Sequence, residues 1–136
     1  EKGELDRERL AEIVFSKKEE LSMLNGIIHP AVKEEIRRKI AKEERKNTNL
    51  FIVEAALLIE DNYEEICDEL WYVYVEDEIR KKRLIYARGY DARKVDDIIA
   101  AQLPKDVFLK HCDRVIDNNG VFEETKMQLD QILADL

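Results

Sequence analysis

Three arginines fall close together in the second half of the chain: Arg80, Arg83 and Arg88. A spacing of three residues places Arg80 and Arg83 on one face of a helix. A guanidinium group suits phosphate because its planar fork donates two parallel, charge-assisted hydrogen bonds. The group therefore predicts either a phosphate-binding face or, together with the neighbouring Lys81 and Lys82, an ordinary solvated helix face.

Two further polar residues stand where a ligand could reach them. Glu54 directly follows an apolar run at residues 50–53, which we expect to be a buried strand. Open α/β sheets bind ligands at that edge, so the carboxylate either orients a Mg²⁺-bound water or caps the next helix. His29 precedes Pro30, and its imidazole either contacts a substrate or serves as a helix cap or a satisfied buried group.

The first 49 residues have the patterns of helices. Asp6 is expected to cap the first helix, and Ser16 with Glu19 forms an S-x-x-E capping box for a second one. Pro30 is expected to begin a third helix, because the first turn does not need the N–H group that proline lacks.

The remainder alternates between strand-like and helix-like segments. Strands are expected at residues 50–53, 71–75 and around 115–116, and helices at 77–88, 92–103 and from 121 to the end. Gly89 suits a helix C-terminus and Asp91 suits a cap. Strands that alternate with helices indicate an α/β fold with a mostly parallel sheet, here three-stranded.

The composition narrows the range of functions. The chain has 136 residues, of which 45% are hydrophobic and 40% charged, and its net charge is −8. Such a charge disfavours broad binding to nucleic acid or to an anionic membrane. No apolar run reaches the roughly 18 residues of a membrane span, and we expect no secretory leader. Cys67 and Cys112 lie far apart without metal-ligand spacing, so we expect a cytoplasmic protein with reduced thiols.

A series of motifs, taken in order, resembles the dephospho-CoA kinase family. The motifs are Asp6-Arg7, Asn25 with His29-Pro30, the stretch at 54–60, Arg83, Gln102 and the stretch at 113–120. The resemblance implies a P-loop kinase fold and transfer of the γ-phosphoryl group of ATP, with Mg²⁺, to the 3′-hydroxyl of dephospho-CoA.

The resemblance also implies how the chain is divided and which residues act. Residues 1–49 would form a helical CoA-binding region, residues 50–75 and 112–136 the nucleotide core, and residues 76–111 a helical lid. The implied site residues are Arg83 and Arg88 as catalytic lid residues, Asn118 and Glu54 at the nucleotide, and Arg7 and His29 at the substrate. Simpler roles remain for two of them: Asn118 as a turn residue and Arg7 as a first-turn helix residue.

One motif of such kinases does not occur. None of the four glycines belongs to a G-x-x-x-x-G-K-[ST] sequence, so we expect a C-terminal part that does not catalyse phosphoryl transfer by itself. Without the first strand of the sheet, we expect one of three outcomes. The strands at 50–53 and 71–75 pair directly, a second chain supplies a strand in an edge-paired or strand-exchanged oligomer, or the fold is marginally stable.

Two alternatives remain open at this point. One is another P-loop kinase of the nucleoside monophosphate type, which shares the fold and the lid. The other is a noncatalytic helical interaction module that uses the amphipathic faces at residues 7–43 and 121–136. Binding of dephospho-CoA would favour the kinase, whereas a partner captured without ATP or CoA would favour the module.

Overall fold

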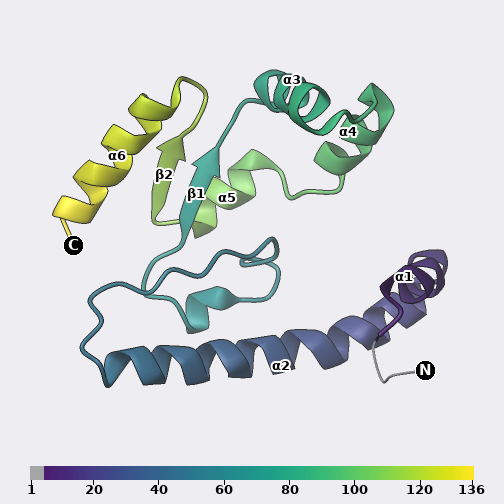
Figure 1. Cartoon of the computed structure of the whole chain (residues 1–136), viewed down its shortest axis with the longest axis horizontal. Helices are drawn as coiled ribbons and strands as arrows, with labels where there is room; N and C mark the ends of the chain where they lie inside the picture. The colour runs from purple at the N-terminus through teal and green to yellow at the C-terminus, as the bar shows by residue number, and fades with distance from the viewer. Residues whose placement is uncertain (1–4) are drawn as a thin grey trace. The chain divides into compact units, whose positions relative to one another are not determined.

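A computed structural model describes residues 5–136, apart from the side chains of Glu8, Phe15, Ser16 and Lys18 (Figure 1). The chain folds as two compact units that meet in sequence between Ala56 and Leu57. The first unit is helical, and the second contains strands and helices.

The first unit consists of α1 (Arg7–Ser16) packed against α2 (Lys18–Glu44). As predicted, Asp6 caps α1: its Oδ1 accepts a hydrogen bond from the backbone N–H of Arg9 at 3.0 Å. Val14 of α1 is buried, with 7% of its surface exposed. The capping bond fixes the start of α1, and the burial of Val14 contributes to its packing.

Helix α2 is continuous where the sequence predicts two helices. It runs through Pro30 without a break, and Lys17, which makes no side-chain capping bond, stands at its N-cap in place of the predicted Ser16 capping box. Proline leaves one helical carbonyl without a donor, that of Gly26 four residues earlier. Both Gly26 and Pro30 are exposed, so water can satisfy that carbonyl, and the helix tolerates the proline.

The prediction of a strand at residues 50–53 is wrong. This segment has no regular structure, and Ile52 is 73% exposed. A strand is stable only when its N–H and C=O groups have a hydrogen-bonding neighbour, and no described segment pairs with this one. The predicted direct pairing of 50–53 with 71–75 is therefore also wrong.

The second unit contains a two-stranded parallel sheet, not the predicted three-stranded one. Strand β1 (Trp71–Tyr74) pairs with β2 (Arg114–Asp117) in a register that sets Trp71 opposite Arg114 and Tyr74 opposite Asp117. The predicted positions of these two strands and the α/β class are confirmed. Ile116, at the centre of β2, is almost fully buried.

Polar contacts hold the start of the sheet together. The backbone N–H of Leu70 donates to Oδ2 of Asp113 at 2.8 Å, and the N–H of Asp113 donates to the carbonyl of Leu70 at 2.8 Å. The guanidinium of Arg114 forms a fork with the carboxylate of Glu69, at 2.7 and 3.0 Å, and the indole of Trp71 donates to the same carboxylate at 2.7 Å. The hydrogen bonds from Arg114 and Trp71 lower the pKa of Glu69.

Helices complete the second unit. A short helix, η1 (Tyr63–Glu65), precedes β1. Helix α3 (Asp77–Arg88) has the predicted bounds and ends at Gly89, whose φ of 64° lies in the left-handed region. Helix α4 (Ala92–Ala100) has the predicted N-cap, Asp91, whose Oδ1 accepts a hydrogen bond from the N–H of Lys94 at 2.9 Å. The helix ends three residues before the predicted position.

Helix α5 (Lys105–His111) was not predicted. Its seven residues are too few for a clear hydrophobic period, and its packing partner lies far away in sequence. The ring of Phe108 stacks on Tyr72 of β1 with centroids 4.6 Å apart, so β1 holds this helix in place. The last helix, α6 (Phe122–Ala134), contacts β2.

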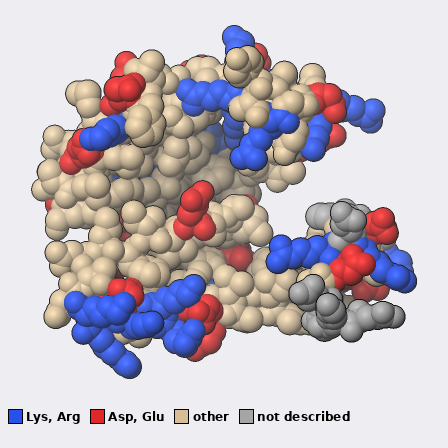
Figure 2. Space-filling model, in the orientation of Figure 1, with Lys and Arg blue, Asp and Glu red and all other residues tan. Residues whose placement is uncertain are grey.

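Charged side chains lie in separate groups on the visible surface. In Figure 2, Lys and Arg side chains gather over α3 and α4, with acidic residues between them. Even the 27-residue α2 is rich in charged side chains, and across residues 5–136 no helix combines the length and apolar character needed to cross a membrane.

Candidate phosphate-binding site

The structure brings two of the predicted site residues together, Arg83 and Asn118. Arg83 lies in the middle of α3, and its guanidinium donates to three consecutive backbone carbonyls in the loop between β2 and α6. The distances are 2.7 Å to Asn118 (from Nη1) and 3.3 and 3.0 Å to Asn119 and Gly120 (from Nη2). We call residues 118–120 the β2–α6 loop.

The β2–α6 loop lies at the carboxyl edge of the sheet, where parallel strands place ligands. The N–H of Asn118 donates to the carbonyl of Tyr74 at 2.8 Å and so extends the parallel pairing by one residue. The side-chain oxygen of Asn119 accepts from the N–H of Glu76 at 2.7 Å, and the N–H of Asn119 donates to Asp117 at 2.8 Å. These bonds tie the loop to the residues that lead from β1 into α3.

The side chain of Asn118 is directed to α6. Its Oδ1 accepts from the hydroxyl of Thr125 at 3.1 Å, and Thr125 itself is buried, with 8% exposed. The same hydroxyl lies 3.3 Å from the carbonyl of Asp117. Asn118 thus anchors α6 to the end of β2 without adopting a positive φ, and a contact with nucleotide remains a prediction.

Arg80 is engaged differently from Arg83. Its Nη2 donates to the carboxylate of Asp77 at 2.8 Å, and its Nη1 donates to the side-chain oxygen of Gln102 at 2.5 Å. Arg80 thus joins α3 to the chain just after α4. Its Nε is buried and has no hydrogen-bond partner within residues 5–136.

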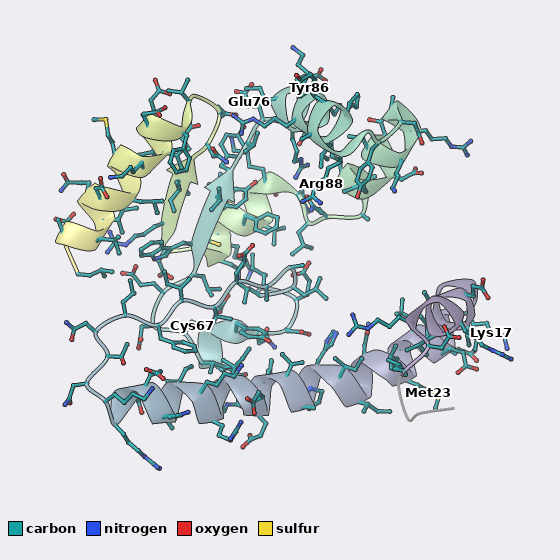
Figure 3. All side chains as sticks on the ribbon, in the orientation of Figure 1. Lys17, Met23, Cys67, Glu76, Tyr86 and Arg88 are labelled. Carbon is teal, nitrogen blue, oxygen red and sulfur yellow. The ribbon has the colours of Figure 1, made fainter. Side chains whose placement is uncertain are left out.

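Arg88 is the last residue of α3, a position where a cation interacts favourably with the helix dipole. Its side chain is exposed and lies on the opposite side of α3 from Tyr86 (Figure 3). Arg88 does not take part in the hydrogen-bond network of Arg83, so a catalytic role for it stays a prediction.

Lys105 is a cation at this edge that the sequence did not single out. Its ammonium lies 3.8 Å from the centroid of the Tyr74 ring, at the end of β1. A hydrogen bond to Tyr74 raises the pKa of Lys105. The only signal in the sequence was its place after Pro104, and nothing there connects it with Tyr74, which is 31 residues away.

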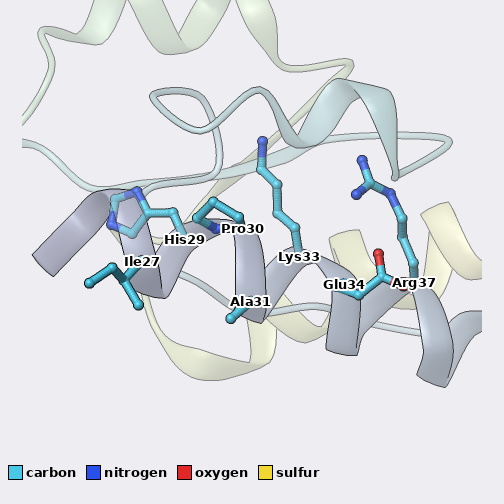
Figure 4. A pocket seen from close by; sticks show the side chains of 7 residues that line it. All are labelled: Ile27, His29, Pro30, Ala31, Lys33, Glu34 and Arg37. Atoms are coloured by element: carbon cyan, nitrogen blue, oxygen red, sulfur yellow. The ribbon is translucent and has the colours of Figure 1, made fainter. Parts of the chain in front are cut away.

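The predicted substrate residue His29 lies on α2 in the first unit. It is half-buried, and it shares one side of the helix with Lys33 and Arg37 because the three are spaced by four residues (Figure 4). They contribute to an open hollow of about 630 Å³ along the helix. The remaining lining residues, also from α2, are Ile27, Pro30, Ala31 and Glu34.

The other two predicted site residues of the first unit, Arg7 and Glu54, do not line this hollow. Arg7 is an exposed residue in the first turn of α1. Glu54 is exposed in the segment without regular structure, and its carboxylate caps no helix, because the next helix, η1, begins only at Tyr63. In the described part of the chain, no group of three or more His, Cys, Asp or Glu side chains is placed to hold a metal ion.

Comparisons of the sequence point to one family. A family model described as CoaE, dephospho-CoA kinase, matches residues 1–124. Two relatives, both named dephospho-CoA kinase, come from Carboxydothermus hydrogenoformans and Corynebacterium glutamicum. The first is 38% identical over 133 residues, which are 98% of this chain and 65% of the relative. The second is 36% identical over 136 residues, which are 100% and 70%.

Solved structures agree in fold. A Thermus thermophilus protein is 30% identical and has a TM-score of 0.74. The match covers 100% of this chain and 70% of the Thermus protein. The dephospho-CoA kinase of Campylobacter jejuni, at 23% identity, shows the same fold with a TM-score of 0.72. The chain spans about two thirds of the length of these relatives and has part of the P-loop kinase fold. From its sequence and its fold, the chain belongs to the dephospho-CoA kinase family.

Proposed function

We propose that this chain carries the acceptor-binding helices and the lid of a dephospho-CoA kinase. The complete enzyme would transfer the γ-phosphoryl group of ATP to the 3′-hydroxyl of dephospho-CoA. The observation that carries the proposal is the position of Arg83, whose guanidinium lies beside the carboxyl edge of the parallel strands in a chain of this family.

Phosphoryl transfer depends on positioning and on neutralising charge more than on covalent chemistry. In the proposal, Arg83 binds an oxygen of the transferring phosphate, because a guanidinium donates several directed hydrogen bonds to one anion. Lys105 adds a second positive charge near the end of β1. Arg88 is proposed to reach the phosphates from the end of α3, and Asn118 is proposed to lie near the adenine.

The acceptor side of the proposal rests on α2. Dephospho-CoA carries a diphosphate, and His29, Lys33 and Arg37 present cationic or titratable groups at four-residue intervals along one side of the helix. Such a row matches an extended anion better than a single charge does. We propose that this row binds the acceptor and that Arg7 contributes to the same substrate.

ATP would bring Mg²⁺ with its phosphates. The 136 residues also lack G-x-x-x-x-G-K-[ST], the sequence whose backbone N–H groups cradle a triphosphate. We therefore propose that this chain by itself does not catalyse the transfer. Turnover of ATP and dephospho-CoA by the purified chain at a kinase-like rate would contradict this part.

Calorimetric titration with dephospho-CoA tests the acceptor part. We expect binding by the native chain and weaker binding by Arg37→Gln. The matched control is Lys42→Gln, since Lys42 is exposed and, nine residues beyond Lys33, lies on the opposite side of α2. Absence of binding, or equal loss in both variants, would argue against the row on α2. A protein captured without any dependence on CoA would instead favour a noncatalytic module.

Two further proposals concern the setting of the chain. We propose a cytoplasmic location, where ATP is available and the two free cysteines stay reduced. The two-stranded sheet has an unpaired edge on each strand in the described structure, so an edge-paired or strand-exchanged oligomer remains a proposal. Size-exclusion chromatography that gives a monomer at all concentrations would contradict it.

A further inference from the structure

The acceptors of Arg83 are all neutral. Its two terminal nitrogens are used by the carbonyls of Asn118, Asn119 and Gly120, and within the described residues it forms no ion pair with a carboxylate. A phosphate oxygen carries negative charge, so it attracts a guanidinium more strongly than a neutral carbonyl oxygen does. The guanidinium is exposed, so an anion can approach it.

Arg80, one turn earlier on α3, has the opposite character. It pairs with the carboxylate of Asp77, so its charge is already compensated, and it also binds Gln102. An anion that bound Arg80 would have to replace an ion pair, whereas one that bound Arg83 would replace only neutral carbonyls. Of these two arginines, Arg83 is therefore the one that an anion can recruit.

We propose that Arg83 is a positioning residue for the β2–α6 loop as well as an anion ligand, and that the two roles exclude each other. In the ligand-free chain, the guanidinium clamps the middle of α3 to the loop. A phosphate group takes the place of the three carbonyls, which releases the loop from α3. This inference rests on the proposed function for the identity of the anion, but the clamp itself does not depend on it.

The other anchors of the loop show what the clamp adds. The N–H of Asn118 and the side chain of Asn119 hold the first part of the loop to Tyr74 and Glu76, but Gly120 is exposed and its carbonyl is held by Arg83. Release of Arg83 should therefore loosen the end of the loop that leads into α6 and leave the paired strands intact.

Amide hydrogen exchange in the full chain tests the clamp. We expect Arg83→Ala to raise the exchange rate of the Asn119 and Val121 amides by about tenfold, which corresponds to roughly 1.4 kcal/mol. Arg83→Lys should give an intermediate increase, because one ammonium cannot span three carbonyls, and it also serves if the alanine variant does not fold. Lys82→Ala, which removes an exposed cation next to Arg83 on α3, is the control and should change nothing. Exchange in both Arg83 variants equal to that of the native chain would overturn the clamp.

Inorganic tripolyphosphate tests the replacement. When it is added to the native chain, exchange of the same two amides should rise toward the rate in Arg83→Ala, and it should produce no further rise in that variant. Bound tripolyphosphate with unchanged exchange, or no binding at all, would overturn the replacement. The calorimetric titration with dephospho-CoA reports on α2 and not on this loop, so failure of the proposed function and failure of this inference are read from different experiments.

Discussion

Alanine at Gly120 should be slightly destabilising, although the backbone of Gly120 is not in the left-handed region. A Cβ built on Gly120 would lie 1.7 Å from Oε2 and 3.0 Å from Cδ of Glu124. The carboxylate of Glu124 would have to move away. In its present position it accepts a hydrogen bond from the N–H of Val121 at 3.2 Å, at the start of α6.

The magnitude follows from two opposing effects. Loss of the capping bond at the start of α6 should destabilise the fold by about 1 kcal/mol. Replacing glycine by alanine also stabilises by about 0.5 kcal/mol, because it reduces the freedom of the unfolded chain. We therefore expect Gly120→Ala to lower the free energy of unfolding by about 0.5 kcal/mol, the difference between these terms. With Glu124→Ala already present, the same change should raise it by about 0.5 kcal/mol.

Urea unfolding of four proteins measures this reversal of sign: the native chain, the two single variants and the double variant. Gly26→Ala in the exposed interior of α2 is the matched control, because a Cβ there would meet no atom within 4 Å. It should stabilise by about 0.5–1 kcal/mol. An equal loss of stability from Gly120→Ala in both backgrounds would refute the clash with Glu124.

Three further changes have defined outcomes. Asp91→Ala should lower the free energy of unfolding by about 1 kcal/mol through loss of the α4 cap. In the same urea assay, Asp91→Asn should keep most of the stability of the native chain, because asparagine is also a good cap. Hydrogen bonds from the guanidinium of Arg114 and from the indole of Trp71 lower the pKa of Glu69 below its ordinary 4.5. The Glu69 carboxylate should therefore stabilise the fold above pH 4.5, and this stabilisation should be lost as the pH falls through the pKa of Glu69 in the folded chain. Trp71 fluorescence should follow the titration, and Glu69→Gln should abolish the pH dependence. Burial raises the pKa of the Cys67 and Cys112 thiols, so alkylation at neutral pH should be slower than in the urea-unfolded chain, and equal rates would count against their burial.

Features that depend on neighbours in sequence were predictable. The caps at Asp6 and Asp91 bind N–H groups three residues away, and the end of α3 at Gly89 needs only a residue that adopts positive φ. Such interactions are complete within one helical turn, so the residue types alone indicate them.

Features that depend on distant partners were not predictable. The apolar run at residues 50–53 has the composition of a strand, but a strand also needs a neighbour, and none pairs with it in the described chain. Conversely, α5 has little helical signal of its own and is held by the stacking of Phe108 on Tyr72. Local signals also failed in α2: Pro30 was expected to start a helix and lies inside it, and Lys17 is the N-cap in place of the predicted Ser16.

For the candidate site, the amino-acid sequence by itself determined the family and named Arg83 and Asn118 as residues of interest. Only the tertiary structure decided that the guanidinium of Arg83 binds the backbone of residues 118–120, 35 residues further along the chain, that Arg80 is occupied by Asp77 and Gln102, and that Lys105 lies on Tyr74. The physical reason is that carbonyl groups are the same in every residue. Their convergence on one cation arises from how β2, α3 and α6 are placed, and no pattern of side chains records it.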